Sequence, residues 1–282
     1  MPALSVFSKT LRDLRWQVFW YGVGLALMAA LVVVIYPSYR DQLADFEIPE
    51  ALQGLIGDAD YASPEGYLTA EFVSWVPIIT VIFAIMAGTS ALAGEEAAGT
   101  MDLLLSQPIS RRRLAVEKIA AILVATVAIT AITCLGWVSS VPFVDIDIDM
   151  VDLFTASLNV VPITLTFAFM AMWAGAAMPD RRGATGIVTG VAVLGYFVNY
   201  LAQLVDVLRP VAWASPFHYY GLDILTAGFD LWKTLALVGL AAGFAIGAVR
   251  SFERRDIGVR STSHFPSTLF RRPHRGRVER AV

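Results

Sequence analysis

The chain has 282 residues, of which 57% are hydrophobic, and a formal net charge of −3 at pH 7. A soluble domain has about 45–50% apolar residues. Here the excess gathers into runs of about 20 residues without Asp, Glu, Lys or Arg, each long enough to cross a membrane as a helix. The composition therefore excludes a soluble globular protein and predicts an all-α integral membrane protein.

We predict six transmembrane helices, at residues 17–36, 74–94, 115–138, 153–178, 184–205 and 231–249. Alternate connecting segments hold 18 of the 21 basic residues: the N-terminal segment, the 95–118 and 179–183 loops, and the tail. Because basic loops stay in the cytoplasm, both termini are predicted to be cytoplasmic. Residues 1–250 then form the transmembrane domain, and 251–282 a basic, disordered cytoplasmic tail.

The N-terminal segment has an amphipathic pattern. Apolar residues recur at helical spacing at Leu4, Phe7, Leu11 and Leu14, and the opposite side is polar. Such a pattern predicts a helix lying in the membrane interface. The simpler alternative is a basic lead-in to the first span.

The loop at 37–73 contains two helix starts. Pro49 can begin a short helix that ends near Gly57. Ser63 followed by Pro64 is typical of an N-cap and the first helical position. We predict that this second helix runs directly into the span at 74–94.

Several kinds of chemistry have no motif in this chain. It contains no G-x-x-x-x-G-K-[ST] phosphate-binding loop, no H-E-x-x-H and no G-x-S-x-G. No charged residue or His falls in the middle of a predicted span, which argues against an ion-coupled transporter. Cys134 is the single cysteine and is interpreted as a small buried core residue. Energy for transport should therefore come from outside the chain, and no metal site is expected.

Polar and small residues inside the spans suggest helix packing. Interhelical hydrogen bonds account for Asn159, Thr164, Thr166, Asn199 and Gln203. Glycines four residues apart let another helix approach closely, and they occur at Gly186, Gly190, Gly239, Gly243 and Gly247. The neighbour is either another helix of the chain or a second copy, and packing within the chain is the simpler interpretation.

The loop between the second and third spans has more structure than a linker needs. It reads EEAAGTMDLLLSQPISRRR from Glu95 to Arg113. Gly99 and Thr100 can end one helix and start a short amphipathic one, which Pro108 ends. Arg111–Arg113 then lie at the membrane edge of the third span. The segment is either a solvated helical turn or a docking element for a soluble partner.

This stretch resembles the segment after the second span in ABC transporter permeases of the second export type, the ABC-2 family. Those proteins share an acidic residue, Gly-Thr, a Leu-Leu run, Pro-Val/Ile-Ser and a basic residue. The stretch Ser215-Pro216-Phe217-His218-Tyr219 before the last span is similar to the family's Ser-Pro-Phe-x-Tyr. The resemblance covers nearly the whole chain up to about residue 250.

The resemblance implies a permease subunit with six transmembrane helices, an N-terminal interfacial helix, a cytoplasmic coupling helix and short external re-entrant helices at 206–230. Two copies would form the pore above two separate ATPase subunits, in the plasma membrane and among its lipids, without nucleic acid. ATP and Mg would bind the partner subunit, so this chain would need no cofactor and no ATPase site of its own. The implied ATPase-coupling residues are Glu95, Glu96, Gly99, Thr100, Met101, Asp102, Leu104, Leu105 and Pro108.

The resemblance leaves the exported substrate open. Trp173, Tyr196, Phe197 and Tyr200 are scattered along the later spans without forming an aromatic belt of the kind found in large glycan exporters. The alternative function is a non-transporting membrane scaffold or sensor that docks a cytoplasmic partner through the 95–113 loop.

Overall fold

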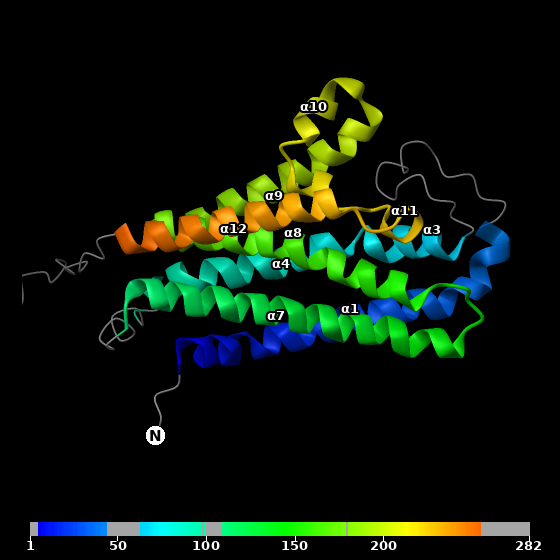
Figure 1. Ribbon diagram of the computed structural model, residues 1–282, viewed down its shortest axis with the longest axis horizontal. Helices are drawn as coiled ribbons and strands as arrows, with labels where there is room; N and C mark the ends of the chain where they lie inside the picture. The colour runs from blue at the N-terminus through cyan, green and yellow to red at the C-terminus, as the bar shows by residue number, and fades with distance from the viewer. Residues whose placement is uncertain (1–4, 44–62, 98, 100–108, 179, 255–282) are drawn as a thin grey trace, which may run out of the picture.

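The computed structural model describes residues 5–43, 63–97, 99, 109–178 and 180–254. Every regular element in these ranges is a helix. Figure 1 shows the long helices side by side along one direction, as an all-α membrane protein requires. The predicted helix at Pro49–Gly57 and the tail from residue 255 lie outside the described residues.

Within the described residues, six helical segments are long and apolar enough to cross a membrane. Four of them are the helices α7 (Arg111–Ser140), α8 (Met150–Ala177), α9 (Arg181–Leu204) and α12 (Leu231–Arg254). The first is α1 (Val6–Leu43), and the second is centred on α4 (Val76–Thr89). The prediction of six spans is confirmed, and most of the helices extend beyond the predicted bounds. The last helix passes the predicted domain boundary at residue 250 and ends at Arg254.

The amphipathic N-terminal segment is helical, and it continues into the first span without a break. At about 1.5 Å per residue, the 38 residues of α1 extend about 57 Å, well beyond a hydrocarbon core. Leu14 is 5% exposed and faces the bundle. The location of these first turns in the membrane interface stays a prediction.

The second span is a composite of helical pieces. Ser63 caps α3 (Pro64–Leu68) by accepting a hydrogen bond from the Gly66 N–H at 3.1 Å. The π-helical turn η1 (Thr69–Val73) and α4 follow directly, so the predicted run from Ser63 into the span is confirmed. A second π-helical turn, η2 (Ser90–Gly94), leads into α5 (Glu95–Ala97).

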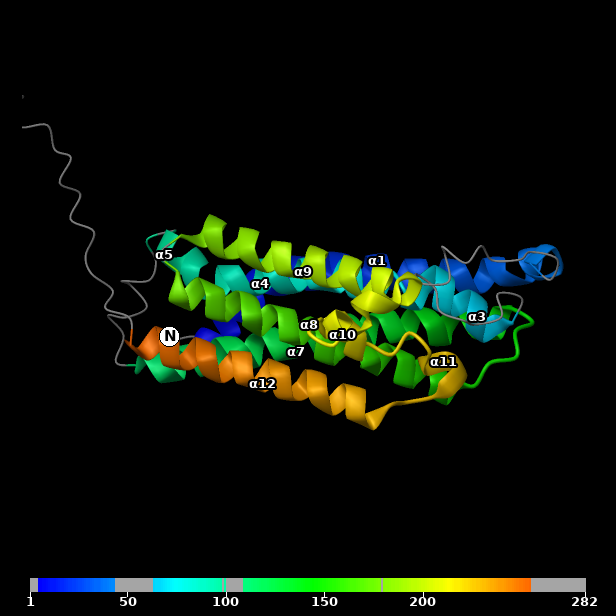
Figure 2. The same ribbon diagram turned by 90° about the horizontal axis from the view of Figure 1, so that it is seen from above.

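The centre of the bundle is α8, which contacts α4, α7, α9 and α12. Its most apolar stretch is 78% buried, whereas the corresponding values are 17% for α9 and 22% for α12. Figure 2 shows α9 and α12 on opposite sides of α8. An apolar helix left open in this way must face lipid or another protein chain.

Two glycines allow the closest helix contacts in the bundle. A Cβ added to Gly88 of α4 would meet the backbone carbonyl of Ala168 in α8, and one added to Gly136 of α7 would meet that of Ala26 in α1. By contrast, a Cβ at Gly186, Gly190, Gly239 or Gly243 would have nothing within 4 Å. Of the two alternatives, the simpler one of packing within the chain does not hold for these four glycines, because their faces of α9 and α12 are open. Only Gly247 of the predicted set packs within the chain, against Trp173.

A compact segment of short helices joins α9 to α12. It contains η4 (Asp206–Leu208), α10 (Arg209–Ala212), η5 (Pro216–Tyr219) and α11 (Ile224–Ala227). Ser215 caps η5 by accepting from the Phe217 N–H at 3.2 Å, and its hydroxyl donates to the Gly195 carbonyl at 2.8 Å. Phe217 packs on Phe167. These contacts explain why Ser, Pro and Phe stand together here, while the re-entrant position of the segment stays a prediction.

Polar side chains tie this segment and the last helix to the centre of the bundle. Asn159 donates to the Gly221 carbonyl at 3.1 Å, and the Thr166 hydroxyl donates to the Leu237 carbonyl at 3.0 Å. The interhelical role predicted for Thr166 is confirmed, whereas Asn159 bonds to a loop residue. Thr164 bonds within its own helix, to Val160. Tyr220 donates to the Val73 carbonyl at 3.0 Å, and burial raises the pKa of its phenol.

Cys134 differs from its predicted environment. The side chain is half-buried on α7 rather than enclosed in the core. Its neighbour Thr133 is buried and Leu135 is exposed, which places Cys134 on the edge of the packed face.

Candidate functional site: an ion-pair cluster at the basic end of the bundle

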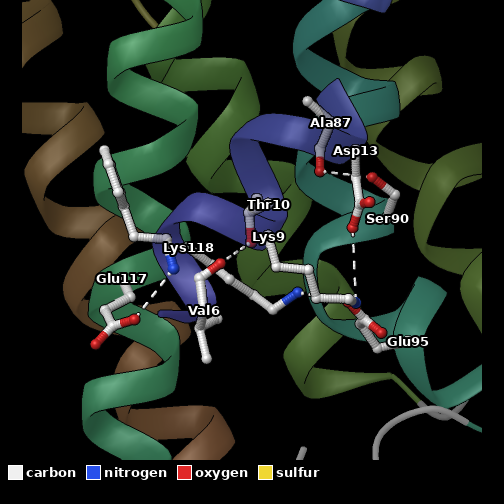
Figure 3. Close-up of polar contacts among 10 residues, drawn as sticks. Val6, Lys9, Thr10, Asp13, Ala87, Ser90, Glu95, Glu117 and Lys118 are labelled. Atoms are coloured by element: carbon white, nitrogen blue, oxygen red, sulfur yellow. Dashed lines mark hydrogen bonds and ion pairs between the residues drawn. The ribbon is translucent and has the colours of Figure 1, made fainter. Parts of the chain in front are cut away.

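Three charged side chains from three helices meet at the end of the bundle that carries Arg111–Arg113, here called the basic end. Lys9 of α1 and Lys118 of α7 both bind the same carboxylate oxygen, Oε1 of Glu95, at 2.7 Å and 3.0 Å. Figure 3 shows the two lysine side chains reaching Glu95 from different helices. We call Lys9, Glu95 and Lys118 the Glu95 cluster.

The Glu95 cluster is largely enclosed. The side chain of Lys118 is 3% exposed and that of Glu95 is 11% exposed, while that of Lys9 is 39% exposed. An ammonium group is almost never buried without a partner, so the carboxylate of Glu95 accounts for the position of Lys118. Removing one member of a buried ion pair typically lowers the free energy of unfolding by about 3–5 kcal/mol, because an uncompensated charge remains in the folded protein.

A second carboxylate fixes the start of α1 to α7. Glu117 accepts a hydrogen bond from the Phe7 N–H at 3.1 Å and one from Nε of Arg113 at 2.8 Å. The first N–H groups of a helix have no partner within the helix, and the helix dipole favours a negative charge there. Glu117 therefore holds the first turn of α1 next to the Glu95 cluster.

The local sequence around Glu95 explains how it reaches this position. The π-helical turn η2 adds a residue to the helical turn just before Glu95 and changes the direction of the side chains that follow. Gly94 keeps the site narrow, since a Cβ there would lie 3.2 Å from the Ser90 Cβ and 3.7 Å from the guanidinium carbon of Arg181. The start of α9 thus lies against the same turn, with Asp180 as its N-cap.

The chain leaves this site through a glycine turn. The N–H of Gly99 donates to the Glu96 carbonyl at 3.1 Å, and Gly99 has a φ of +69°, a conformation that ends helices and favours glycine. The predicted helix end at this glycine is confirmed. Glu96 is half-buried in α5, while Gly99 is exposed.

Six of the nine predicted coupling residues lie outside the described residues: Thr100, Met101, Asp102, Leu104, Leu105 and Pro108. The chain is described again from Ile109. Ser110 caps α7 by accepting from the Arg113 N–H at 3.2 Å, so Arg111–Arg113 form the first turn of the third span as predicted. Glu95 itself is turned into the bundle, and its direct contact with an ATPase stays a prediction.

Sequence reasoning missed Lys9, Glu117 and Lys118 as members of this site. Lys118 was assigned to the charged loop before the third span, but it is the eighth residue of α7 and is 2% exposed. A signal was present, because Lys118 falls at helical spacing between the apolar residues Leu114 and Ile122. A lysine on a packed face needs a buried anion, and Glu95 is an acidic residue at the neighbouring helix end.

The residues of this site do not form a metal centre. Among the described residues, no three His, Cys, Asp or Glu side chains come together as a set that could hold a metal ion. The arrangement consists of alternating charges that connect α1, α5 and α7.

The comparisons with known proteins agree with this architecture. The model of the ABC-2 family transporter protein matches residues 4–257, which include all six membrane-spanning segments and the Glu95 cluster. No curated protein matches the chain. The six apolar helical segments make it a multi-pass membrane protein. On this match, the chain belongs to the ABC-2 family of transporter proteins.

Proposed function

We propose that the chain is the transmembrane permease subunit of an ATP-driven exporter, coupled to a separate ABC ATPase subunit. The segment at 99–108 would be the coupling helix that the ATPase binds. The observation that carries this proposal is the position of Glu95. It lies four residues before the first residue of the segment and is bonded to Lys9 of α1 and Lys118 of α7.

This geometry supplies a physical route for coupling. A displacement of the docked segment would act through α5 on the carboxylate of Glu95. The two lysines would carry the movement to the first and third spans, which also pack on each other along their lengths. Because the cluster is enclosed, its charges attract one another more strongly than they would in water.

The proposal includes sidedness and assembly. The basic end would face the cytoplasm with both termini, in the plasma membrane, and two copies would form the transport path with two ATPase subunits beneath them. ATP and Mg would bind the ATPase subunits. The permease domain, predicted at residues 1–250, would extend to the end of α12 at Arg254, and the residues after it would form a cytoplasmic tail.

A pull-down of the ABC ATPase subunit with the full-length chain tests the docking step. We expect Leu104→Glu to reduce the recovered ATPase by about tenfold, because a charge on the apolar face of a docked helix costs at least about 1.4 kcal/mol. The matched control is Val207→Glu. It places the same charge at an 82% exposed residue of η4, at the other end of α9.

Two results would contradict the proposal. Undiminished recovery of the ATPase with Leu104→Glu would show that the segment at 99–108 is not the coupling helix. If no ATPase is recovered with the unaltered chain, the alternative of a membrane scaffold or sensor would be favoured instead.

A further inference from the structure

An open groove runs along one face of α12, at the opposite edge of the bundle from α1. It has a volume of about 740 Å³ and is bounded by Trp173 of α8 and by Trp213 and Tyr219 of the segment after α9. Its floor is the α12 face that carries Gly239, Gly243 and Gly247. This volume is in the range of about 300–1,000 Å³ that is typical of ligand sites. We call this feature the α12 groove.

The aromatic walls of the α12 groove are held in place by hydrogen bonds. Nε1 of Trp173 donates to the Ser251 hydroxyl at 3.1 Å, and its ring lies 5.7 Å from that of Phe244. The Tyr219 hydroxyl donates to the Trp213 carbonyl at 3.0 Å. The rings are nonetheless open, with Trp173 40% and Trp213 61% exposed.

The α12 groove lies at a depth where it is surrounded by the lipid chains of the membrane. Its floor lies within the membrane-spanning segment Leu231–Arg254. The medium at this depth is hydrocarbon, and a Cβ at Gly239 or Gly243 would meet nothing within 4 Å. An acyl chain can therefore enter the groove from the side and contact the helix backbone.

Two arginines continue the groove face toward the basic end. With 3.6 residues per turn, Arg250 and Arg254 fall on the same side of α12 as Gly243 and Gly247. The bond from Trp173 to Ser251 fixes the orientation of this turn. Both arginines are exposed. The exposed Glu253 follows Arg250 at i+3 and is its neighbour on the helix surface, so two cations stand against one carboxylate at this turn. Guanidinium groups bind phosphate with paired hydrogen bonds, so their chemistry matches an anionic lipid headgroup.

We propose that the α12 groove binds an acyl chain of an anionic phospholipid whose phosphate lies at Arg250 and Arg254. The groove supplies an apolar path for the chain, and the arginines supply the charge at the end where a basic protein surface meets anionic headgroups. This site does not depend on ATPase docking.

Native mass spectrometry of the full-length chain tests this site. The protein is exchanged into micelles that contain equal amounts of phosphatidylglycerol and phosphatidylcholine, and the retained lipids are counted. We expect the unaltered chain to retain phosphatidylglycerol preferentially. Arg250→Gln combined with Arg254→Gln should reduce that preference by about tenfold, because charge-assisted contacts are lost. Gly243→Leu should reduce the retention of both lipids, since the side chain fills the groove.

Two matched variants control for general effects. Arg12→Gln removes an exposed charge from α1 and should leave the lipid preference unchanged. Figure 1 shows α1 on the opposite side of the bundle from α12. Gly186→Leu adds the same side chain to an open face of α9 and should leave lipid retention unchanged.

Three outcomes would overturn the proposal. The unaltered chain could retain both lipids equally or none at all. The arginine and glycine variants could retain lipid as the unaltered chain does. The third outcome is that Gly243→Leu converts a dimer to a monomer in the same spectra. That result would assign the α12 groove to a second copy of the chain.

Discussion

At the scale of single residues, Glu95 is the carboxylate on which two lysines depend. Glu95→Gln preserves the shape of the side chain and removes its charge, so it leaves the ammonium of Lys118 enclosed beside that of Lys9. Because Lys9 is partly exposed and can turn to water, we expect a loss of about 2–4 kcal/mol in the free energy of unfolding, near the lower end for a broken buried pair. Unfolding by sodium dodecyl sulfate in mixed micelles, followed by tryptophan fluorescence, measures this loss.

Asp13→Asn provides the matched comparison for Glu95→Gln. The Asp13 carboxylate also lies near Lys9, at 3.6 Å, but its side chain is 58% exposed. Surface pairs contribute at most about 1 kcal/mol, so this variant should unfold nearly as the unaltered chain does. Equal losses in the two variants would show that the enclosure of Glu95 has no energetic effect.

At the scale of helices, Gly136 sets the distance between α1 and α7. A Cβ at this position would meet the backbone of Ala26, which cannot move aside as a flexible side chain could. We expect Gly136→Ala to lower the free energy of unfolding by about 1–3 kcal/mol, because overpacking forces the two helices apart. The same detergent titration measures the effect.

The comparison is Gly186→Ala, at a helical glycine with open space around it. Here the added methyl group should leave stability unchanged or raise it by up to about 1 kcal/mol, since alanine favours the helix more than glycine does. If both alanine variants behaved alike, the close contact of α1 with α7 at Gly136 would be refuted.

The sequence predicts the helices of this fold better than their contacts. Runs without charge locate all six spans, because the cost of burying a charge in hydrocarbon is large. The ends are less well predicted, since Arg111 and Arg254 continue their helices beyond the apolar runs. Glycine spacing identifies a face but not its neighbour, so the pattern at Gly186 suggested packing that the structure places at Gly136 instead.

The sequence predicted only Glu95 among the members of the Glu95 cluster. Glu95 was marked by its place at the start of an unusual loop, and the resemblance assigned it to the ATPase contact. Its lysine partners lie 86 positions before it and 23 after it. Only the packing of α1 and α7 brings them together. A spacing pattern within one helix can show that Lys118 needs a partner, but it cannot name the partner.

At the scale of the whole molecule, the bundle is asymmetric. The central α8 is enclosed, while α9 has the least buried apolar stretch of the six spans at 17%. Large apolar side chains recur along its open face at Ile187, Val191, Leu194 and Leu201, near the seven-residue repeat of left-handed helix pairs. This regular stripe favours a helix as its neighbour, in contrast to the irregular aromatic walls of the α12 groove.

The proposed second copy should therefore meet the first across α9. In a chain whose Cys134 is replaced by Ala, we expect Leu194→Cys to form a disulfide-linked dimer on mild oxidation in membranes. Leu194 is 67% exposed, and two copies of one helix related by a two-fold axis bring the same residue near itself. Non-reducing gel electrophoresis detects the dimer. The matched control is Leu235→Cys on α12, which is 53% exposed and should remain monomeric. Dimers from Leu235→Cys but not from Leu194→Cys would move the interface to α12, and the lipid assigned to its groove would then be displaced by protein.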